Sequence, residues 1–356
     1  MTQANLTFYN VTDCGYYHRD SDLPAFGTLD GLLSDFLAWA KDGQKKLGDT
    51  CTYLPVETSG LLRTFCYDCM RDSYTGDVLL VTWNESSSHD GHVTHVREDD
   101  EVGSASVEST PLPPKSIPGH PTYFWFLPTK KAYATIRFES PLNGNEGMRK
   151  LLKEFAAKFS EHCVAGPNGG VGKIEILGYR QDPADTESTP LHLFPRFKSQ
   201  LARKPGFTEY IVGSRARIRK IHRKNLVLQA ARPDTDDSRT FADLFDRLEG
   251  GLPETGRNDV HVSYEIDVTP TETELMGIIN AWTSRTRHDS RTKWEDVGFQ
   301  LHGEGAKVHW LSSSLIKYEP QLDLSPDTNG GVTADLLFAE LLRVRQQAIR
   351  SLNQRG

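Results

Sequence analysis

The chain has 356 residues, a formal net charge of −7 at pH 7, and a content of 37% hydrophobic, 25% charged and 10% aromatic residues. These totals are ordinary for a globular protein that is long enough for two domains. They exclude helical membrane spans, because no run approaches the roughly 18 to 20 apolar residues that such a span needs. The first residues lack the pattern of a secretory signal, and the five cysteines have no regular spacing, as is typical of free thiols. We therefore expect a cytoplasmic protein.

Strand-like and helix-like segments alternate along the chain. In chain order, runs of β-branched and aromatic residues predict strands at 6–12, 61–70, 77–84, 123–127, 132–138, 173–179, 225–231, 260–268, 297–301 and 308–318. Apolar residues at helical spacing predict helices that begin near 28, 148, 214, 241, 271 and 333. A stretch from 86 to 121 that is rich in Ser, His, Pro and acids predicts a long exposed loop.

The order of these elements predicts an α+β fold, because strand hairpins alternate with helices and no βαβ phosphate-loop pattern is present. We expect mostly antiparallel sheets, built from hairpins with packed helices, in two lobes. An N-terminal α+β lobe spans 1–104 and a linker or loop spans 105–121. An α+β domain then spans 122–356 and carries an inserted basic lobe at about 180–290.

The segment 192–228 is strongly basic in an otherwise acidic chain. Between 196 and 224 it holds ten cations and one acid, Glu209, so this window carries about +9 and the rest of the chain about −16. The cations are Arg196, Lys198, Arg203, Lys204, Arg215, Arg217, Arg219, Lys220, Arg223 and Lys224. A helix that needs only solubility usually alternates the signs of its charges. The near absence of acids therefore favours contact with the phosphates of a nucleic acid.

The densest part of this segment, 214–224, predicts a short helix. Ser214 is a suitable N-cap, and Ile218 and Ile221 lie three residues apart on a narrow inward edge. The cations would then cover the outer faces of the helix. The alternative is a solvated basic face that holds acidic side chains of the same protein.

Candidate metal and catalytic residues are few. Cys66 and Cys69, together with His92 and His95, have the ligand types of a zinc site. However, residues three apart in a strand point to opposite faces, so we expect structural thiols and surface histidines instead. The sequence has no nucleophile elbow, no HExxH and no phosphate-binding loop. We expect no catalytic residues, no metal and no cofactor.

A metal-dependent nuclease is the alternative enzymatic interpretation. Such a nuclease needs acids that converge on a metal ion. Glu175, Glu265 and Asp267 all lie on predicted strands. Glu265 and Asp267 are two residues apart, which more simply predicts the solvent-facing side of a sheet.

Two apolar segments offer further binding surfaces. The aromatic residues at 123–126 have the side-chain types that stack on bases, although a hairpin this apolar is typical of a core. The helix at 333–352 has an apolar seam that includes Leu337, Leu341 and Val344 and that is wide enough to pack against a second copy. We therefore expect a homodimer, in which two basic segments contact DNA.

Several local patterns recur in one order. Phe8 and Tyr9 open the first strand, a turn at 119–121 leads into the aromatic strand, and a second strand ends at 134–138 before a helix. In this order, and in its closing amphipathic helix, the chain resembles the phage-encoded RexA exclusion proteins and, more distantly, RdgC-type DNA-binding proteins. The likeness covers mainly 6–160 and 333–352, and the middle of the chain, with its basic segment, departs from it.

The resemblance implies a dimer that binds duplex DNA without sequence preference, within an antiphage defence or phage-exclusion system that has a partner protein at the membrane. It brings no catalytic residues. Because no helix-turn-helix or zinc finger is present to read bases, the basic segment also predicts double-stranded DNA binding of low specificity. Two alternatives remain: a metal-dependent nuclease of a defence system, and an interaction module whose basic segment docks an acidic partner.

Overall fold

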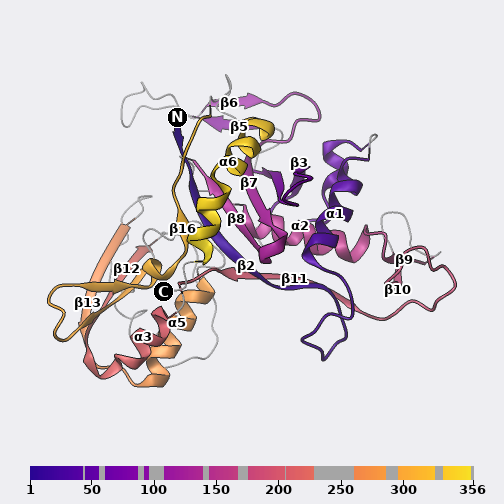
Figure 1. Ribbon diagram of the computed structural model, residues 1–356. Helices are drawn as coiled ribbons and strands as arrows, with labels where there is room; N and C mark the ends of the chain where they lie inside the picture. Colours follow the sequence, from indigo (N-terminus) through magenta and orange to yellow (C-terminus); the bar gives the residue numbers. More distant parts are fainter. Residues whose placement is uncertain are drawn as a thin grey trace. The chain divides into compact units, whose positions relative to one another are not determined.

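The computed structural model of the chain is shown in Figure 1. It describes residues 1–42, 45–55, 61–86, 92–95, 108–138, 144–166, 175–204, 206–227, 260–285, 296–324 and 332–353. The chain divides into two compact units: the first unit is Met1–Gln200 with Tyr318–Ala348, and the second unit is Leu201–Lys317 with Ile349–Gly356. Helices and mostly antiparallel sheets make up both units, which confirms the predicted α+β class.

A seven-stranded sheet forms the centre of the first unit, in the order β11-β2-β8-β7-β4-β3, and β16 also pairs with β2. Its strands are β2 (Asn5–Tyr17), β3 (Thr64–Arg71), β4 (Val78–Glu85), β7 (Gly119–Leu127), β8 (Ala132–Arg137), β11 (Phe194–Leu201) and β16 (Lys317–Tyr318). The end of the predicted linker at 105–121 already belongs to the large sheet, because Gly119–Pro121 are part of β7 and pair with β4.

Three short strand pairs also belong to the described part of this unit. They are β1 (Thr2–Gln3) with β17 (Gln321–Leu322), β5 (His92–His95) with β6 (Glu108–Pro111), and β9 (Cys163–Ala165) with β10 (Ile176–Tyr179). The pair β5–β6 lies where the sequence predicts only a loop. Its Ser-, His- and acid-rich strands lack the apolar alternation that marks a strand in sequence.

Helices cover both faces of the large sheet (Figure 1). Two of them, α1 (Leu29–Ala40) and α2 (Asn145–Lys158), pack against each other and against β3. The face beneath α2 carries Tyr133, whose hydroxyl donates a hydrogen bond to Asn145 Oδ1 (2.6 Å). The third helix, α6 (Ala334–Asn353), is joined through an ion pair to the face that carries Trp125.

The aromatic strand β7 is core on both sides. Phe124, Trp125 and Phe126 are fully buried, and Tyr123 is nearly so. Bases cannot stack on side chains that are enclosed in this way, so the expectation that this hairpin belongs to the core is confirmed and the stacking alternative at 123–126 is wrong.

A buried ion pair holds α6 to the sheet. Asp77, just before β4, is fully buried and accepts hydrogen bonds from Trp125 Nε1 (3.2 Å) and from Arg345 Nε and Nη2 (2.7 and 3.0 Å). The apolar seam of α6 is buried within the same chain, and both Leu337 and Leu341 have no exposed surface. The seam is therefore not a free surface for a second copy, and the homodimer stays a prediction.

The second unit is built on a four-stranded antiparallel sheet in the order β13-β12-β14-β15. Its strands are β12 (Ile218–Val227), β13 (Val260–Asp267), β14 (Asp296–Leu301) and β15 (Val308–Trp310). Two helices, α3 (Phe207–Gly213) and α5 (Glu272–Arg285), lie side by side (Figure 1). The predicted capping box opens α5: Glu274 accepts from the Thr271 N–H (2.8 Å), and Thr271 accepts from the Glu274 N–H (3.3 Å).

The helix predicted at 214–224 is wrong. Ser214 follows the last residue of α3 and closes that helix, because its N–H donates to the Tyr210 carbonyl (2.9 Å). Residues 215–217 form a single 3-10 turn, and β12 begins at Ile218. The helix predicted near 241 lies outside the described residues.

A β-bulge explains why the spacing in β12 was misleading. Ile218 lies opposite Leu301 and Ile221 lies opposite Phe299, with Arg219 as the extra residue of the bulge. Because the two partners are two residues apart in β14, both isoleucines point to one face of the sheet. A spacing of three, which is typical of a helix, therefore occurs here in a strand.

Candidate nucleic-acid interface

The two faces of β12 differ in character. Ile221 and its cross-strand neighbour Phe299 are buried on one face. Lys220, His222 and Lys224 occupy the alternate positions and therefore lie on the opposite face, where they are partly exposed. The central strand of the sheet thus brings two of the predicted cations and an imidazole to one surface.

Polar side chains from the neighbouring strands contact this row. Lys220 Nζ lies 2.6 Å from Glu265 Oε1 and 4.0 Å from Asp267 Oδ1. His222 Nε2 lies 3.2 Å from Gln300 Oε1, and its Nδ1 lies 3.6 Å from Glu265 Oε2. The hydrogen bond from Lys220 lowers the pKa of Glu265. The side chains of Glu265 and Asp267 are 52% and 76% exposed, as predicted for the solvent-facing side of a sheet.

Trp310 packs on the same surface at the edge strand. A Cβ atom at Gly298 would lie 2.8 Å from Trp310 Cε3 and 2.4 Å from Val308 Cγ1, so this packing requires glycine. Lys224 Nζ lies 4.3 Å from the centre of the indole ring, within the range of a cation–π contact. The indole therefore contacts both the sheet backbone and a cation.

Glu304, in the turn between β14 and β15, accepts three hydrogen bonds. Its Oε1 accepts from the Tyr210 hydroxyl (2.7 Å) and from Arg217 Nη2 (2.9 Å), and its Oε2 lies 2.7 Å from His309 Nε2. These bonds, that of Tyr210 foremost, lower the pKa of Glu304 to about 2. A carboxylate with so low a pKa is a weak general base at neutral pH. The network therefore fixes the turn to α3 and to the 3-10 turn.

The structure divides the ten predicted cations between the two units. Arg196 and Lys198 lie on β11 in the first unit. The Arg196 guanidinium lies 4.5 Å from the centre of the Tyr17 ring, and Lys198 Nζ lies 3.0 Å from Asp13 Oδ2. The other eight cations belong to the second unit.

Several of these eight have partners that are distant in sequence. Arg215 pairs with Glu272 at the start of α5 (3.1 Å), and the Arg203 guanidinium lies 5.3 Å from the centre of the Trp282 ring. Arg223 is partly exposed on β12 and is also engaged in a contact. By contrast, Lys204 and Arg219 are exposed and form no ion pair within the described part of the chain.

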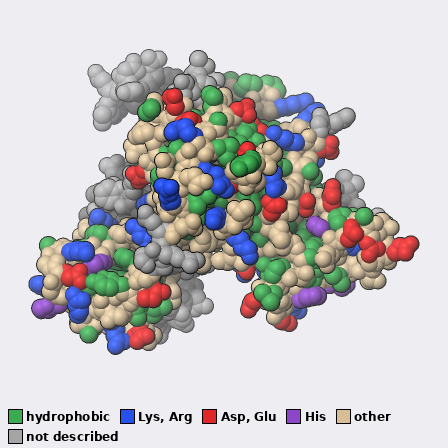
Figure 2. Space-filling model, in the orientation of Figure 1, with side chains coloured by type: hydrophobic (Ala, Val, Ile, Leu, Met, Phe, Trp, Pro, Cys, Tyr) green, Lys and Arg blue, Asp and Glu red, His purple; other side chains and the backbone are tan. Residues whose placement is uncertain are grey.

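Figure 2 shows the surface of the second unit, where Lys and Arg side chains are interspersed with Asp and Glu side chains. The basic window of the sequence is therefore not one continuous basic patch. Its acidic counterparts come from β13, from α5 and from the β14–β15 turn, which lie far outside the window in sequence.

A metal centre has no support in the described residues, which contain no group of three or more His, Cys, Asp and Glu side chains that could hold a metal ion. Glu265 and Asp267 face Lys220, whereas Glu175 belongs to the first unit. The side chains of His92 and His95 lie outside the described residues, so the zinc alternative stays untested.

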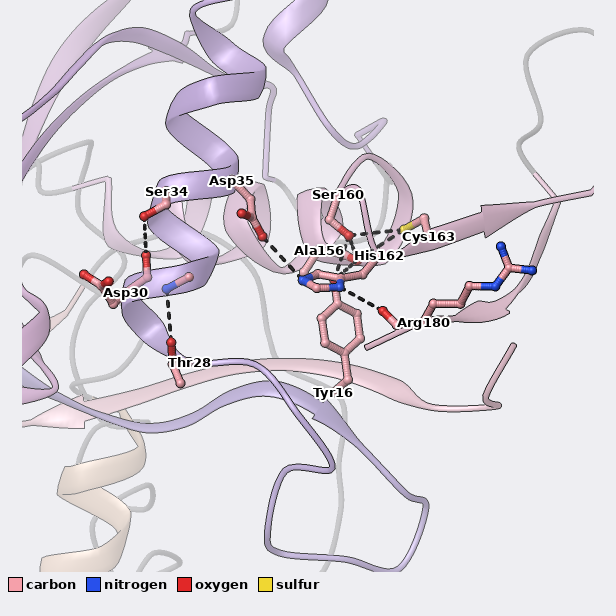
Figure 3. Close-up of polar contacts among 11 residues, drawn as sticks. Tyr16, Thr28, Asp30, Ser34, Asp35, Ala156, Ser160, His162, Cys163 and Arg180 are labelled. Atoms are coloured by element: carbon pink, nitrogen blue, oxygen red, sulfur yellow. Dashed lines mark hydrogen bonds and ion pairs between the residues drawn. The ribbon is translucent and has the colours of Figure 1, made fainter. Parts of the chain in front are cut away.

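A second polar cluster surrounds His162 in the first unit (Figure 3). It includes an acid, Asp35, and two potential nucleophiles, Ser160 and Cys163, which are the residue types of a catalytic triad. However, His162 Nδ1 lies 2.8 Å from the Arg180 carbonyl oxygen and Nε2 lies 3.6 Å from Asp35 Oδ2. Nδ1 therefore contacts a backbone carbonyl and Nε2 lies near an acid, and no hydrogen bond within the described part of the chain joins either nitrogen to Ser160 or Cys163.

The nucleophiles of this cluster are also held in structural contacts. Ser160 Oγ lies 2.7 Å from the Tyr16 hydroxyl and 3.4 Å from Cys163 Sγ. Burial raises the pKa of the Cys163 thiol and thereby disfavours the reactive thiolate. Through these contacts the cluster joins β2 to the end of α2.

Comparisons with models of protein families, with curated proteins and with solved structures find no match to this chain. The resemblance to exclusion proteins and the role in defence therefore stay predictions. Among the described helices, none is both long enough and apolar enough to cross a membrane.

Proposed function

We propose that the second unit binds double-stranded DNA through its phosphates, without sequence preference. The main support for the proposal is that β12 has one apolar face and one face that carries cations. One face is buried core, and on the other face Lys220 and Lys224 lie about 13 Å apart along the strand. Arg219 is exposed at the adjacent bulge, and Lys204 adds another exposed cation.

The cations that already have acidic partners can exchange them for phosphates. Glu265 and Glu272 are 52% and 65% exposed, and exposed ion pairs contribute little to stability. Each phosphate that a cation neutralises also releases condensed counterions from the DNA, a gain that an acid of the protein does not offer. Lys220 and Arg215 are thus available to DNA despite their pairing.

Low specificity follows from the kinds of side chain involved. Contacts from Lys and Arg to phosphates fix the position of a protein on the duplex but carry no direct sequence information. Since 214–224 is not a helix, it offers no recognition helix for the major groove.

The test compares two double variants that remove the same charge. Lys204→Gln with Arg219→Gln removes two proposed contacts, whereas Lys130→Gln with Lys153→Gln removes two exposed cations of the first unit. Binding to a fluorescent duplex of about 30 base pairs is measured by anisotropy over a salt series. We expect the slope of log affinity against log salt to become less negative by about 1.8 for the first variant and to stay unchanged for the second. Equal effects of the two variants would contradict the proposal.

A further inference from the structure

Two buried polar atoms of the first unit, Thr135 Oγ1 and Arg149 Nε, lack a hydrogen-bond partner in the described part of the chain. Thr135 is only 1% exposed, so its hydroxyl cannot turn to solvent instead. Buried polar side chains nearly always have a partner, and an exception needs a physical explanation. Both atoms lie on the same side of the large sheet, the side that α2 covers, so one explanation can serve for both.

The strands β8 and β2 set the surroundings of Thr135. It lies between Tyr133 and Arg137 on β8, and the three side chains share one face because they occupy alternate positions. Thr7 of β2 lies opposite Thr135, and Tyr9 lies opposite Tyr133. The rings of Tyr9 and Tyr133 stack with their centroids 5.0 Å apart. The Thr135 hydroxyl is thus flanked by a guanidinium along the strand in one direction and by two phenol rings in the other.

Helix α2 brings a second guanidinium to this place. The Tyr133 hydroxyl donates to Asn145 Oδ1 in the first turn of the helix (2.6 Å). Arg149 is four residues further on, so it lies on the same side of α2 about one turn away. The charges of Arg137 and Arg149 both act to lower the pKa of the Tyr9 hydroxyl, which agrees with this placement, although burial outweighs them and raises that pKa to about 12.

These side chains have the chemistry of an anion site. Two guanidinium groups supply positive charge, and within the described residues no acid forms an ion pair with Arg149. A cation that is partly buried without a counter-ion is unfavourable, and a bound anion offsets that cost. Tyr9 keeps its proton at neutral pH, so its hydroxyl and that of Thr135 can both donate hydrogen bonds.

We propose that Thr135, Arg137, Arg149 and Tyr9 bind a phosphate group, either free or carried by a small molecule. Charge-assisted hydrogen bonds from guanidinium groups to phosphate oxygens are strong. The donors come from two strands and a helix and approach from several directions, which suits a tetrahedral anion better than a planar carboxylate. All four side chains belong to the first unit, so the proposal does not depend on DNA binding by the second unit.

Thermal unfolding of the full chain in phosphate tests the proposal, with acetate at the same pH and ionic strength as the comparison. At a tenfold excess of phosphate over its Kd, we expect Tm to rise by roughly 3–6 °C, and acetate to have little effect. Arg149→Met should abolish the rise. Lys153→Met removes an exposed cation one turn further along α2 and should preserve it. A rise of equal size in acetate, or in Arg149→Met, would overturn the proposal.

Thr135→Val separates binding from folding, because it exchanges a hydroxyl for a methyl group of similar size. Without phosphate this variant should be at least as stable as the wild type, since the hydroxyl has no hydrogen bond to lose. Calorimetric titration with phosphate should give a Kd about tenfold higher, which corresponds to the loss of one hydrogen bond to a charged group. An unchanged Kd, or a large loss of stability without phosphate, would show that the hydroxyl has a structural role only.

Adenosine monophosphate in the same titration identifies the source of the phosphate group. Because Thr135 is so deeply buried, we expect inorganic phosphate to bind more tightly. Tighter binding of adenosine monophosphate would assign the site to phosphate monoesters. Failure of both compounds to bind the wild-type chain would overturn the proposal, whatever the variants do.

Discussion

Arg345→Met is expected to destabilise the first unit strongly. The Asp77 carboxylate has no exposed surface, and two N–H groups of Arg345 reach it at 2.7 and 3.0 Å. Methionine preserves much of the aliphatic volume of the arginine but removes its charge. Among the described residues, the buried carboxylate would then keep the hydrogen bond from Trp125 alone (3.2 Å).

The expected loss is about 3 kcal/mol, the lower end of the roughly 3–5 kcal/mol that removal of one partner of a buried pair costs, because the Arg345 side chain is 16% exposed. That corresponds to a fall in Tm of roughly 6–12 °C.

Burial raises the pKa of Asp77 above its usual value. The pKa of Asp77 is therefore higher in the folded state than in the unfolded state. Asp77 stabilises the fold at low pH, and this contribution is lost as pH rises through the pKa of the folded state. Loss of Arg345 raises the pKa of Asp77 further. The difference in stability between the wild type and Arg345→Met should therefore be smaller at pH 4 than at pH 7.

Thermal unfolding followed by circular dichroism at both pH values measures this effect. Arg343→Met is the matched control, because Arg343 lies on the same helix but is 55% exposed and pairs with Glu340 on the helix surface. It should change Tm little. Arg345→Met combined with Asp77→Asn should recover part of the loss, since no charge is then left buried. An equal loss in the two single variants, or a double variant no better than Arg345→Met, would refute the reasoning.

Three further predictions concern the second unit. Gly298→Ala places a Cβ 2.4 Å from Val308 and 2.8 Å from Trp310, so we expect a loss of roughly 1–3 kcal/mol in denaturant unfolding together with altered tryptophan fluorescence. Glu304→Gln removes a carboxyl group whose pKa is about 2 in the folded state, below its value in the unfolded state. The wild type should therefore lose more stability than this variant as pH falls from about 4.5 to 2, which an acid titration measures. Thr271→Ala removes the N-cap of α5 and should cost about 1 kcal/mol, whereas Thr271→Ser should cost less.

Local signals made much of the fold predictable. Thr28 caps α1 as expected, since its hydroxyl accepts from the Gly31 N–H (3.1 Å). The capping box of α5 and the apolar seam of α6 were likewise evident from a few neighbouring residues. Such features depend on interactions within one turn of a helix, and sequence spacing therefore reports them directly.

Two β-bulges account for two wrong predictions. In β12 the bulge places Ile218 and Ile221 on one face, which imitates the spacing of a helix. In β3 a bulge places Cys66 and Cys69 on one face, where regular alternation separates them. A bulge depends on how a strand pairs with its partner, and this pairing is not visible within the strand's own sequence.

The partners of the basic segment were equally hidden. The window 196–224 contains one acid, yet Glu265, Glu272 and Glu304 reach its cations from distant positions in the chain. Counting charges along the sequence therefore overstated the positive field of this surface. Only the antiparallel pairing of β12 with β13, and the placement of α5, bring these acids to the cations.

The central claim is that the second unit binds duplex DNA through phosphates, and the anisotropy of the wild-type chain against a duplex over a salt series tests it most directly. If Lys204, Arg219, Lys220 and Lys224 each neutralise one phosphate, the slope of log affinity against log salt is about −3.6, and affinity falls by about 150-fold between 50 and 200 mM salt. A duplex that fails to bind at 50 mM salt, or an affinity that does not change with salt, would contradict the claim.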